Sequence, residues 1–383
     1  MRPLPLSALS SFLLGCFFAA TITGAYAQES VSLFNGKDLS GWVFVNTSPR
    51  TWQVQDGILV CSGKPIGEIR TERMFQNFEF EIEWRHMVPG GNAGIFVWAD
   101  DITARGVPFH RGIEVQVLEN AYGNNESHTT HGDIFPIHGA TMTPINGRGG
   151  SRAFPTENRS KPSPEWNQYR IVCNDGHISL AVNGKVVTQG EEASPRKGYI
   201  CLESEGGVAH YRNLRIKELP DTPIEAKHVA IANRGYRSVY SGLDLSGWRL
   251  NDAAKSAWLV KDWVLAFDGK VPASDARLEL AESLPLAGFV IDFRFTAKSE
   301  NLAVYLPGAA EPLTISVKDD ARYGKSLQKT GAWNRLEGSI QDGQLVLTIN
   351  GQRNESKHDA KSGSLALEAS GPVELANLYV REK

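Results

Sequence analysis

The run Glu114-x-Gln116-x-x-Glu119 places two carboxyl groups and one amide within a few residues of each other. In a regular strand Glu114 and Gln116 point to the same face, whereas Glu119 joins them only if a bulge intervenes. Such carboxyl groups suit acid–base chemistry on a sugar, because retaining glycosidases use two of them about 5 Å apart. We therefore interpret Glu114, Gln116 and Glu119 as candidate catalytic residues. The alternative is a solvated strand face that does no chemistry.

Several histidines lie near this run, in a stretch rich in Gly, Asn and Thr. Neutral imidazole can act as a general base or bind a metal near neutral pH. We interpret His131 as the first candidate among them for a general base or a metal ligand. The spacing His128-x-x-His131-x-Asp133 could also chelate a divalent cation, although it matches no defined zinc signature. No cofactor follows firmly from the sequence, and a solvated loop histidine is the alternative for each.

Four further side chains are candidates for substrate binding. They combine a cation, an amide, an aromatic ring and an imidazole, which are groups that hold sugar hydroxyls and ring faces, and they are Arg85, Asn92, Trp98 and His138. Turn chemistry is the alternative for Asn92, and a place in the core is the alternative for Trp98.

The chain carries one domain twice. Leu33-Phe34-Asn35-Gly36-Lys37-Asp38-Leu39-Ser40-Gly41-Trp42 returns as Val239-Tyr240-Ser241-Gly242-Leu243-Asp244-Leu245-Ser246-Gly247-Trp248. The second copy lacks a block that lies between Arg85 and Glu165 of the first, and that block holds the candidate catalytic run. We find no counterpart of that run in the second copy. Function is therefore expected in the first copy.

The duplication also tests single residues. Glu203 aligns with Glu368, and its retention in a copy that lacks the block indicates a structural role. Glu83, by contrast, becomes Arg294 in the second copy. Loss of a site would permit that charge reversal, and so would surface drift.

Strands are predicted throughout. Residues 78–85 alternate apolar and charged side chains, which is typical of a strand with one buried face. Frequent Asp-Gly and Asn-Gly pairs predict hairpins. The fold class is therefore all-β, with two tandem β-sandwich or jelly-roll domains. We expect a signal peptide at residues 1–27, a first domain at 31–219, a linker at 220–236 and a second domain at 237–383.

The leader predicts a secreted or periplasmic protein, because Ala25-Tyr26-Ala27 forms a cleavage site. Lipid anchoring at Cys16 is the less favoured alternative. The three remaining cysteines are odd in number and lie at strand-like positions, which indicates buried thiols rather than disulfides.

Composition excludes some classes of partner. The chain is 41% hydrophobic and 22% charged, and its net charge is −3. Because Lys and Arg are scattered, nucleic acid is not an expected partner. No transmembrane segment is expected after residue 30.

The motifs together resemble the 3-keto-disaccharide hydrolase family, a group formerly known only as a domain of unknown function. The resemblance rests on 33–42, Gly91-Asn92-Ala93-Gly94-Ile95-Phe96, Gly112-Ile113-Glu114-Val115-Gln116-Val117-Leu118, Trp166-Asn167 and Tyr211-Arg212-Asn213-Leu214-Arg215-Ile216-Lys217. It covers about residues 31–219 and, weakly, 237–381. The family is similar to concanavalin-like jelly rolls, which include laminarinase-type glycosidases with a Glu-x-Asp-x-x-Glu signature. Gln116 stands where that signature has Asp. The family usually has Asp at the position of Glu119 and Ser at that of Ala93.

The resemblance implies a partner that is an oligosaccharide or glycoside oxidised at C3. A ketone at C3 acidifies the C2 proton, so a base can remove it and the glycosidic oxygen can leave from C1. The implied roles are base or acid for Glu114 and His131, orientation for Gln116, acid or ligand for Glu119, Asp133 and His138, and sugar binding for Arg85. Two alternatives stay open: a lectin-like module without catalysis, and a glycosidase acting on unmodified glycans.

Overall fold

The computed structural model describes residues 29–317, 323–341, 344–357 and 363–383. The predicted signal peptide, with the alternative anchor at Cys16, lies outside the described residues. Among the described residues no helix has the length and apolar character needed to cross a membrane. Strands dominate, every ladder between named strands is antiparallel, and the all-β prediction is confirmed.

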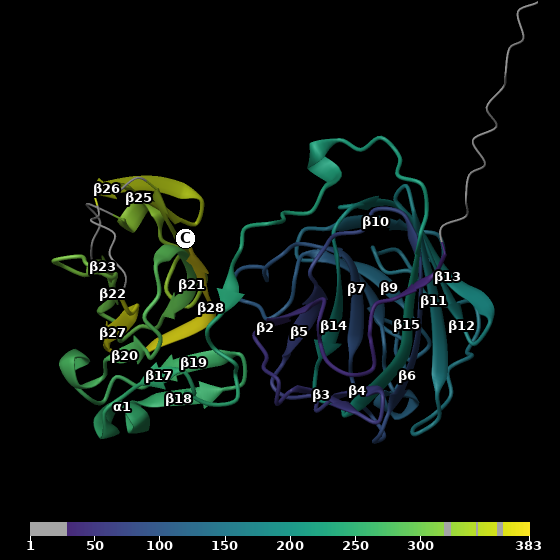
Figure 1. The fold of residues 1–383 in the computed structure, drawn as a ribbon, viewed down its shortest axis with the longest axis horizontal. Coiled ribbons are helices and arrows are strands. Elements are labelled where there is room, and N and C mark those ends of the chain that lie inside the picture. Colours follow the sequence, from purple (N-terminus) through teal and green to yellow (C-terminus); the bar gives the residue numbers. More distant parts are fainter. Residues whose placement is uncertain (1–28, 318–322, 342–343, 358–362) are drawn as a thin grey trace, which may run out of the picture.

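The first domain consists of two sheets (Figure 1). The nine-stranded sheet has the order β10 (Thr141–Pro144), β13 (Lys185–Ser194), β12 (His177–Val182), β11 (Asn167–Asn174), β6 (Phe78–His86), β15 (Ala209–Glu218), β4 (Ile58–Cys61) and β3 (Trp52–Gln55), with β1 (Val31–Ser32) beside β15. The six-stranded sheet has the order β2 (Trp42–Val45), β5 (Gly67–Thr71), β14 (Tyr199–Ser204), β7 (Gly94–Ala99), β8 (Gly112–Gln116) and β9 (Ile134–Ile137). Two 3-10 turns, η1 (Asn120–Tyr122) and η2 (Ala226–His228), lie outside the sheets.

The second domain repeats this arrangement with fewer strands. Its eight-stranded sheet has the order β18 (Trp258–Lys261), β19 (Val264–Phe267), β28 (Val373–Glu382), β21 (Leu286–Phe295), β24 (Trp333–Gln341), β25 (Gln344–Ile349) and β26 (Gln352–Lys357), with β16 (Arg237–Ser238) beside β28. Its five-stranded sheet has the order β17 (Trp248–Arg249), β20 (Leu278–Leu280), β27 (Ala366–Ser370), β22 (Asn301–Tyr305) and β23 (Leu313–Ser316). The short helix α1 (Asp252–Ala257) and the turns η3 (Ala273–Asp275) and η4 (Gly324–Ser326) complete it.

Alternating side chains explain why each pair of sheets closes on a core. In β6 the residues Phe78, Phe80, Ile82 and Trp84 are buried, while the charged residues between them are partly exposed. Each domain has its own large cluster of buried apolar side chains. Burying such side chains stabilises a fold by roughly 1.5–3 kcal/mol each. The three cysteines Cys61, Cys173 and Cys201 are buried free thiols, as the sequence predicted.

One sequence expectation about the second domain is wrong. We expected no counterpart of the strand that carries Glu114, yet β23 pairs with β22 as β8 pairs with β7. The four residues of β23 are Leu-Thr-Ile-Ser and carry no carboxyl group. The second domain therefore keeps this strand in the same place but without a carboxyl group. The sequence did not reveal the strand, because its residues share no motif with β8.

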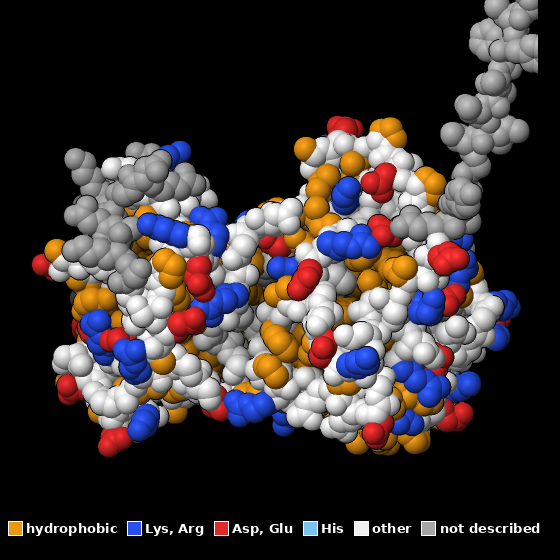
Figure 2. Space-filling model, viewed as in Figure 1, with side chains coloured by type: hydrophobic (Ala, Val, Ile, Leu, Met, Phe, Trp, Pro, Cys, Tyr) orange, Lys and Arg blue, Asp and Glu red, His pale blue; other side chains and the backbone are white. Residues whose placement is uncertain are grey.

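The surface agrees with the composition. Figure 2 shows Lys and Arg side chains dispersed over both domains among Asp and Glu side chains. On this face of the molecule no single sign of charge dominates, in keeping with the net charge of −3. The expectation that nucleic acid is not a partner stays a prediction.

Candidate active site

The outer face of the six-stranded sheet brings together residues from three strands. Gly94 of β7 pairs with Gln116, and Phe96 pairs with Glu114, both of β8. On the other side of β7, Leu202 of β14 pairs with Ile95, which sets Glu203 beside Gly94. Ile95, Val115 and Leu202 point into the core. Because side chains alternate, the polar residues of these strands share the outer face.

The absent side chain at Gly94 makes room for two carboxyl groups. A Cβ atom at this position would lie 2.7 Å from Glu203 Oε2 and 3.1 Å from Glu114 Oε1. The first distance is shorter than real Cβ contacts and the second is tight, so a side chain at this position would displace one or both carboxyl groups. Glu114 and Glu203 therefore converge over the backbone of β7, and Gly94 leaves them this space.

A third carboxyl group, that of Glu205, joins the pair. Burial, and then the negative charge of Glu205, raise the pKa of Glu114 well above its usual range, although Arg152 opposes the shift. The same two causes, with Glu114 in third place, raise the pKa of Glu203. Burial raises the pKa of Glu205 to about 7. The raised pKa values of three adjacent carboxyl groups are a feature that active sites use for acid–base catalysis.

Amide groups and a cation surround this carboxyl cluster. Asn92 donates a hydrogen bond to Glu205 Oε2, and Gln116 Nε2 donates to Asn92 Oδ1 over 3.2 Å. Arg152 lies over the ring of Phe135, with 3.4 Å between its Cζ atom and the ring centroid. These contacts place two hydrogen-bonding amides and a positive charge beside the carboxyl groups.

A pocket of about 250 Å³ lies next to this cluster, and Glu114, Glu203 and Glu205 are not among the residues that line it. It is lined by Asn92, Gln116, Leu118, Tyr122, Ser127, His128 and Arg152. Tyr122 is 47% exposed, which leaves its ring available to a ligand. The predicted residues Gln116 and Asn92 are thus brought together, with Glu114 in the same sheet face.

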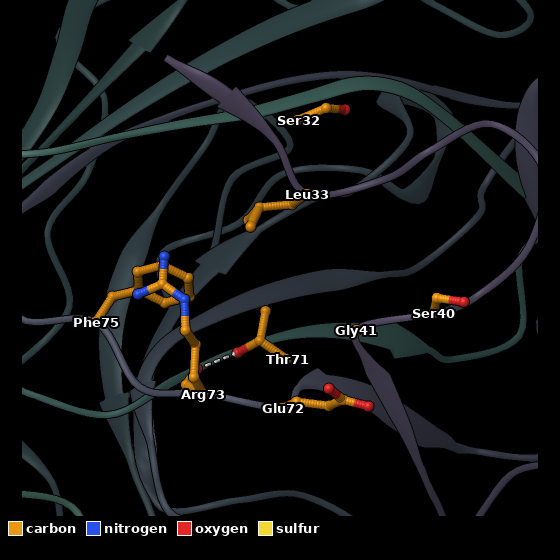
Figure 3. A pocket seen from close by; sticks show the side chains of 8 residues that line it. All are labelled: Ser32, Leu33, Ser40, Gly41, Thr71, Glu72, Arg73 and Phe75. Carbon is orange, nitrogen blue, oxygen red and sulfur yellow. Dashed lines mark hydrogen bonds between the residues drawn. The ribbon is translucent and has the colours of Figure 1, made fainter. Parts of the chain in front are cut away.

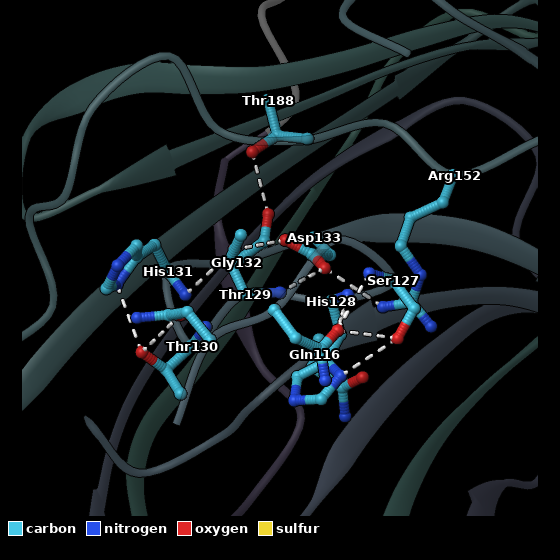
Figure 4. Close-up of polar contacts among 12 residues, drawn as sticks. Gln116, Ser127, His128, Thr129, Thr130, His131, Gly132, Asp133, Arg152 and Thr188 are labelled. Carbon is cyan, nitrogen blue, oxygen red and sulfur yellow. Dashed lines mark hydrogen bonds and ion pairs between the residues drawn. The ribbon is translucent and has the colours of Figure 1, made fainter. Parts of the chain in front are cut away.

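Asp133 fixes the cation of the pocket (Figure 4). Its Oδ2 atom accepts hydrogen bonds from the Thr129 backbone over 2.8 Å and from Arg152 Nη1 over 3.0 Å. Asp133 is fully buried. The carboxylate is therefore committed to holding Arg152 and the loop, so it acts as a positioning group.

Glu119 does not join the cluster, which corrects the sequence prediction. Strand β8 ends at Gln116, and Glu119 caps the turn η1 instead. Its carboxylate accepts backbone hydrogen bonds from Gly90, Ala121 and Ser163 at 2.7–3.0 Å. Burial raises its pKa, but these three bonds outweigh burial and the pKa is lowered. A carboxylate held in this way is a structural cap.

Two of the predicted substrate-binding residues lie elsewhere. Trp98 is fully buried in the core, and its Nε1 donates to Gln76 O over 2.8 Å. Arg85 follows the buried Trp84 in β6, so it faces outward from the opposite sheet. There it stacks on Trp166 and contacts His210 over 3.2 Å. Neither side chain reaches the pocket.

The histidines separate into different environments. His131 Nδ1 lies 3.2 Å from Thr130 Oγ1 and 3.3 Å from Ser160 Oγ, and His131 is not among the residues that line the pocket. Figure 4 shows it on the other side of Asp133 from Arg152. His128 does line the pocket. His138 is exposed and stacks on Phe109, with 6.4 Å between the ring centroids.

The predicted cation ligands His128, His131 and Asp133 do not gather. Among the described residues, one group of three or more such side chains has its ligand atoms within 4.8 Å of one another: Glu68, His110 and Cys201. All three are buried, and Cys201 Sγ lies 3.7 Å from His110 Nδ1, which also contacts Glu68. Carboxylate, imidazole and thiol together suit zinc-like cations. The structure therefore offers a candidate cation site at this buried triad and not at His128, His131 and Asp133.

Another pocket lies apart from the carboxyl cluster (Figure 3). Its volume is about 310 Å³, and its lining includes Thr71, Glu72, Arg73 and Phe75. Arg73 lies over the Phe75 ring and pairs with Glu218. The one cation of this pocket is therefore already engaged.

Sequence reasoning missed Glu203, Glu205 and Arg152. Glu203 was set aside because the second copy retains it as Glu368. The useful signal was the next residue on the same face, since Glu205 becomes Ser370 in the second copy. Arg152 lies in a Gly-rich loop without strand periodicity, so no pattern linked it to Glu114.

A family model, the 3-keto-alpha-glucoside-1,2-lyase-like domain, matches residues 29–217. No curated protein matches the chain. Among solved structures, a "putative glycosyl hydrolase" from Parabacteroides distasonis is 23% identical and has a TM-score of 0.39, with 50% of this chain and 94% of that chain covered.

Two other solved structures are more distant in sequence. The carbohydrate binding module CBM66 from Bacillus subtilis is 11% identical, with a TM-score of 0.35 and coverage of 46% of this chain and 96% of that one. The beta-glucanase from Bacillus licheniformis is 11% identical, with a TM-score of 0.35 and coverage of 51% and 100%. On the strength of this match, residues 29–217 form a 3-keto-alpha-glucoside-1,2-lyase-like domain.

Proposed function

We propose that the first domain cleaves glycosides that carry a ketone at C3, by removing the C2 proton and eliminating the glycosidic oxygen. The observation that carries this proposal is the convergence of Glu114 and Glu203 over Gly94, with Glu205 alongside. The family match supports the substrate class.

Glu114 is the base in this proposal. Its raised pKa makes its ionised form a strong base, and the neighbouring Arg152 favours that ionised form. The C2 proton moves to Glu114, and its bonding electrons form an enolate with the C3 oxygen. Arg152 is the positive charge available to stabilise the enolate oxygen.

Glu205 is the acid. With a pKa of about 7, it holds a proton in a large fraction of molecules at neutral pH. As the enolate collapses, the C1–oxygen bond breaks and the leaving oxygen takes the proton of Glu205. The products are the free aglycone and a sugar enone, to which water can add in a later step. Asn92 and Gln116 orient the sugar, and a hydrogen bond from Glu203 partly offsets the rise in the pKa of Glu205.

Glu119 is not available as the second carboxylate of ordinary retaining hydrolysis. That reaction needs a second carboxylate about 5 Å from the first, free to attack C1. Glu119, which occupies the matching place in the Glu-x-Asp-x-x-Glu signature, is committed to three backbone N–H groups. The lectin-like alternative requires no raised pKa, so the carboxyl cluster does not favour it.

A divalent cation bound by Glu68, His110 and Cys201 would be a second positive charge near the carboxyl groups, in addition to Arg152. Glu68 lies on β5, next to the strand that carries Glu203, and its charge raises the pKa values of Glu114 and Glu203. We propose that Glu68, His110 and Cys201 bind a zinc-like cation. Addition of Co²⁺ should then give visible absorption and a sulfur-to-metal band, both lost in Cys201→Ser. Absence of these bands in the unaltered protein would remove the cation from the proposal.

The route by which C2 loses its proton can be tested with deuterium. We expect a 3-keto-glucoside with deuterium at C2 to react more slowly than its protium form, because the C2 bond breaks before or during departure of the aglycone. Hydrolysis through an oxocarbenium ion leaves that bond intact. Equal rates for both substrates, with the aglycone released, would show that C2 proton removal does not determine the rate. The sugar product of a reaction run in D₂O would then be examined for deuterium taken up from the solvent. Absence of both effects would refute the elimination.

The predicted export of the protein remains part of the proposal. A substrate outside the cytoplasm would fit it. Cell fractionation of the producing organism, with detection of the mature chain, tests this.

A further inference from the structure

The hairpin of residues 103–110, which joins β7 to β8, projects from the first domain onto the second. Its ends are tied by a bridge between Thr103 and His110, and Ala104 N donates to Phe109 O over 2.8 Å. Past the hairpin the chain runs directly into β8, which carries Glu114 and Gln116. The hairpin therefore sets where β8 begins.

The second domain holds the tip of this hairpin by its backbone. Gly106 N donates to Asp292 Oδ2 over 2.8 Å, and Arg335 Nη2 donates to Thr103 O over 2.9 Å. Asn377 Nδ2 donates to Ala104 O over 3.1 Å and to the carbonyl of Val107 over 2.9 Å.

Side chains close the same contact. Thr103 Oγ1 lies 2.8 Å from the Tyr379 hydroxyl. A Cβ atom at Gly106 would lie 2.2 Å from Trp333, and the φ of Gly106 is +72°, so this position requires glycine. The tip of the hairpin thus fits the second domain without space for a larger residue.

The groups that hold the hairpin are built for that purpose. Asp292 is fully buried and forms an ion pair with Arg335 over 2.7 Å, and Asn377 donates to Asp292 over 2.7 Å. Burying charge is costly unless every group is paired, and the N–H group of Gly106 is one of the partners of Asp292. The first domain therefore completes a polar network of the second.

The duplication supplies an internal control for this network. In the first copy the residues aligned with Asp292, Arg335 and Asn377 are Glu81, Gln168 and Asn213. Gln168 and Asn213 are exposed, and Glu81 is partly exposed. The same face of the sheet is solvated in one copy and buried against the hairpin in the other.

The other end of the hairpin reaches the candidate site. His110 contacts Glu68, and Phe109 packs on Phe96 with 6.1 Å between the ring centroids. Phe96 pairs with Glu114 across the ladder. The hairpin thus connects the contact with the second domain to Phe96, which lies beside Glu114.

We propose that the second domain is a brace for the site of the first: Asp292, Arg335 and Asn377 hold hairpin 103–110 and so position His110 and β8. The link to catalysis rests on the proposed function, whereas the brace itself does not.

Amide hydrogen exchange of the full chain tests the brace. Asn377→Ala removes two bonds to the hairpin, and we expect amides of residues 103–110 to exchange at least about tenfold faster. Tyr379→Phe removes only the hydroxyl that meets Thr103 and should give a smaller increase in the same segment. Arg50→Ala is the matched control, because it removes an exposed ion pair between the domains, with Asp244, away from the hairpin.

The imidazole signals of ¹⁵N-histidine-labelled protein provide the readout at the site. Asn377→Ala and Tyr379→Phe should both shift the signal of His110, identified by its loss in His110→Gln, and Arg50→Ala should not. If Asn377→Ala unfolds the second domain, Tyr379→Phe still decides. Unchanged exchange and an unchanged His110 signal in Tyr379→Phe, or equal changes in Arg50→Ala, would overturn the brace. Neither readout requires turnover, so an inactive wild type would refute the proposed function and leave the brace testable.

Discussion

Each domain has a matching row of positions across its smaller sheet, but the residues in the two rows differ in charge. From β5 to β8 the row of the first domain is Glu68, Glu203, Gly94 and Gln116. In the second domain the matching row is Arg277, which directly precedes β20, followed by Glu368, Ala303 and Thr314. In the second domain Glu368 contacts Arg277 over 3.2 Å and the Tyr305 hydroxyl over 2.7 Å. Glu203 has no cation beside it in its row, whereas the aligned Glu368 forms an ion pair with Arg277.

The comparison teaches what makes a retained glutamate reactive. Glu203 Oε2 is buried and has no hydrogen-bond partner, whereas both oxygens of Glu368 have one. An unpaired buried carboxyl group costs free energy of folding, and a stable protein keeps it only where the surroundings over-determine its position. The fold supplies the place, and the neighbouring residues decide between chemistry and stability.

Glu114→Gln should give the largest effect, because it removes the base and preserves the size of the side chain. We expect kcat on a 3-keto-glucoside to fall by about 10³-fold. Glu279→Gln, in an exposed ion pair of the second domain, is the control and should stay within about twofold. A loss below about tenfold for Glu114→Gln would assign the base elsewhere.

The pH dependence of stability should differ between the copies. Because the pKa of Glu205 is raised to about 7, its contribution is fully present below the unfolded pKa of about 4.3 and is lost as pH rises toward and through about 7. Chemical denaturation at pH 5 and pH 8 should show a loss of up to about 3 kcal/mol that is absent in Glu205→Gln. Ser370 holds this position in the second domain, so Ser370→Ala should not alter the slope. An unchanged slope in Glu205→Gln would show that this carboxyl group does not titrate as described.

The aligned pair Glu203 and Glu368 gives a direct exchange test. Glu203→Gln should lower kcat by about 10²-fold, because it removes one of the three adjacent carboxyl groups and changes the pKa of Glu205. Glu368→Gln should leave kcat unchanged and cost about 1 kcal/mol of stability, since Arg277 and Tyr305 lose an ionised partner. Steady-state kinetics and urea unfolding of both variants measure this. Equal kinetic effects would erase the distinction between the two rows.

The smallest expected effect concerns the residue between the carboxyl groups. Gly94→Ala should lower kcat by about tenfold, because its Cβ would push Glu203 and Glu114 apart. Ala303→Gly, the reverse change in the second domain, should leave kcat unchanged and lower the unfolding free energy by about 0.5–1 kcal/mol. Kinetics and denaturation of the two purified variants decide. Full activity in Gly94→Ala would mean that the carboxyl groups do not need this spacing.

Strand periodicity predicted much of the fold. The alternation in residues 78–85 predicted the buried face of β6, and the repeated motif predicted two β-sandwiches. Local patterns could not show which strands become neighbours. Glu203 and Glu114 are 89 positions apart and meet because β7 lies between their strands, a long-range pairing that periodicity does not encode.

The site was predicted where adjacent residues share a face. Glu114 and Gln116 lie on the same face two residues apart, and Asn92 joins them through the turn before β7. The predictions for Glu119 and Trp98 were wrong. Strand β8 ends before Glu119, and the backbone at Trp98 is left-handed, with a φ of +56°. Caps and left-handed residues break the two-residue period, so residues beyond them cannot be placed from spacing.

The release of 4-nitrophenol by the purified mature chain tests the central claim most directly. The substrates are 4-nitrophenyl 3-keto-glucoside and the parent 4-nitrophenyl glucoside, in both anomers and under identical conditions. The account predicts release from a keto substrate alone, and its loss in Glu114→Gln. Release from the parent glucoside at a comparable rate, or release from neither substrate by a folded protein supplied with Zn²⁺ or Co²⁺, would contradict it.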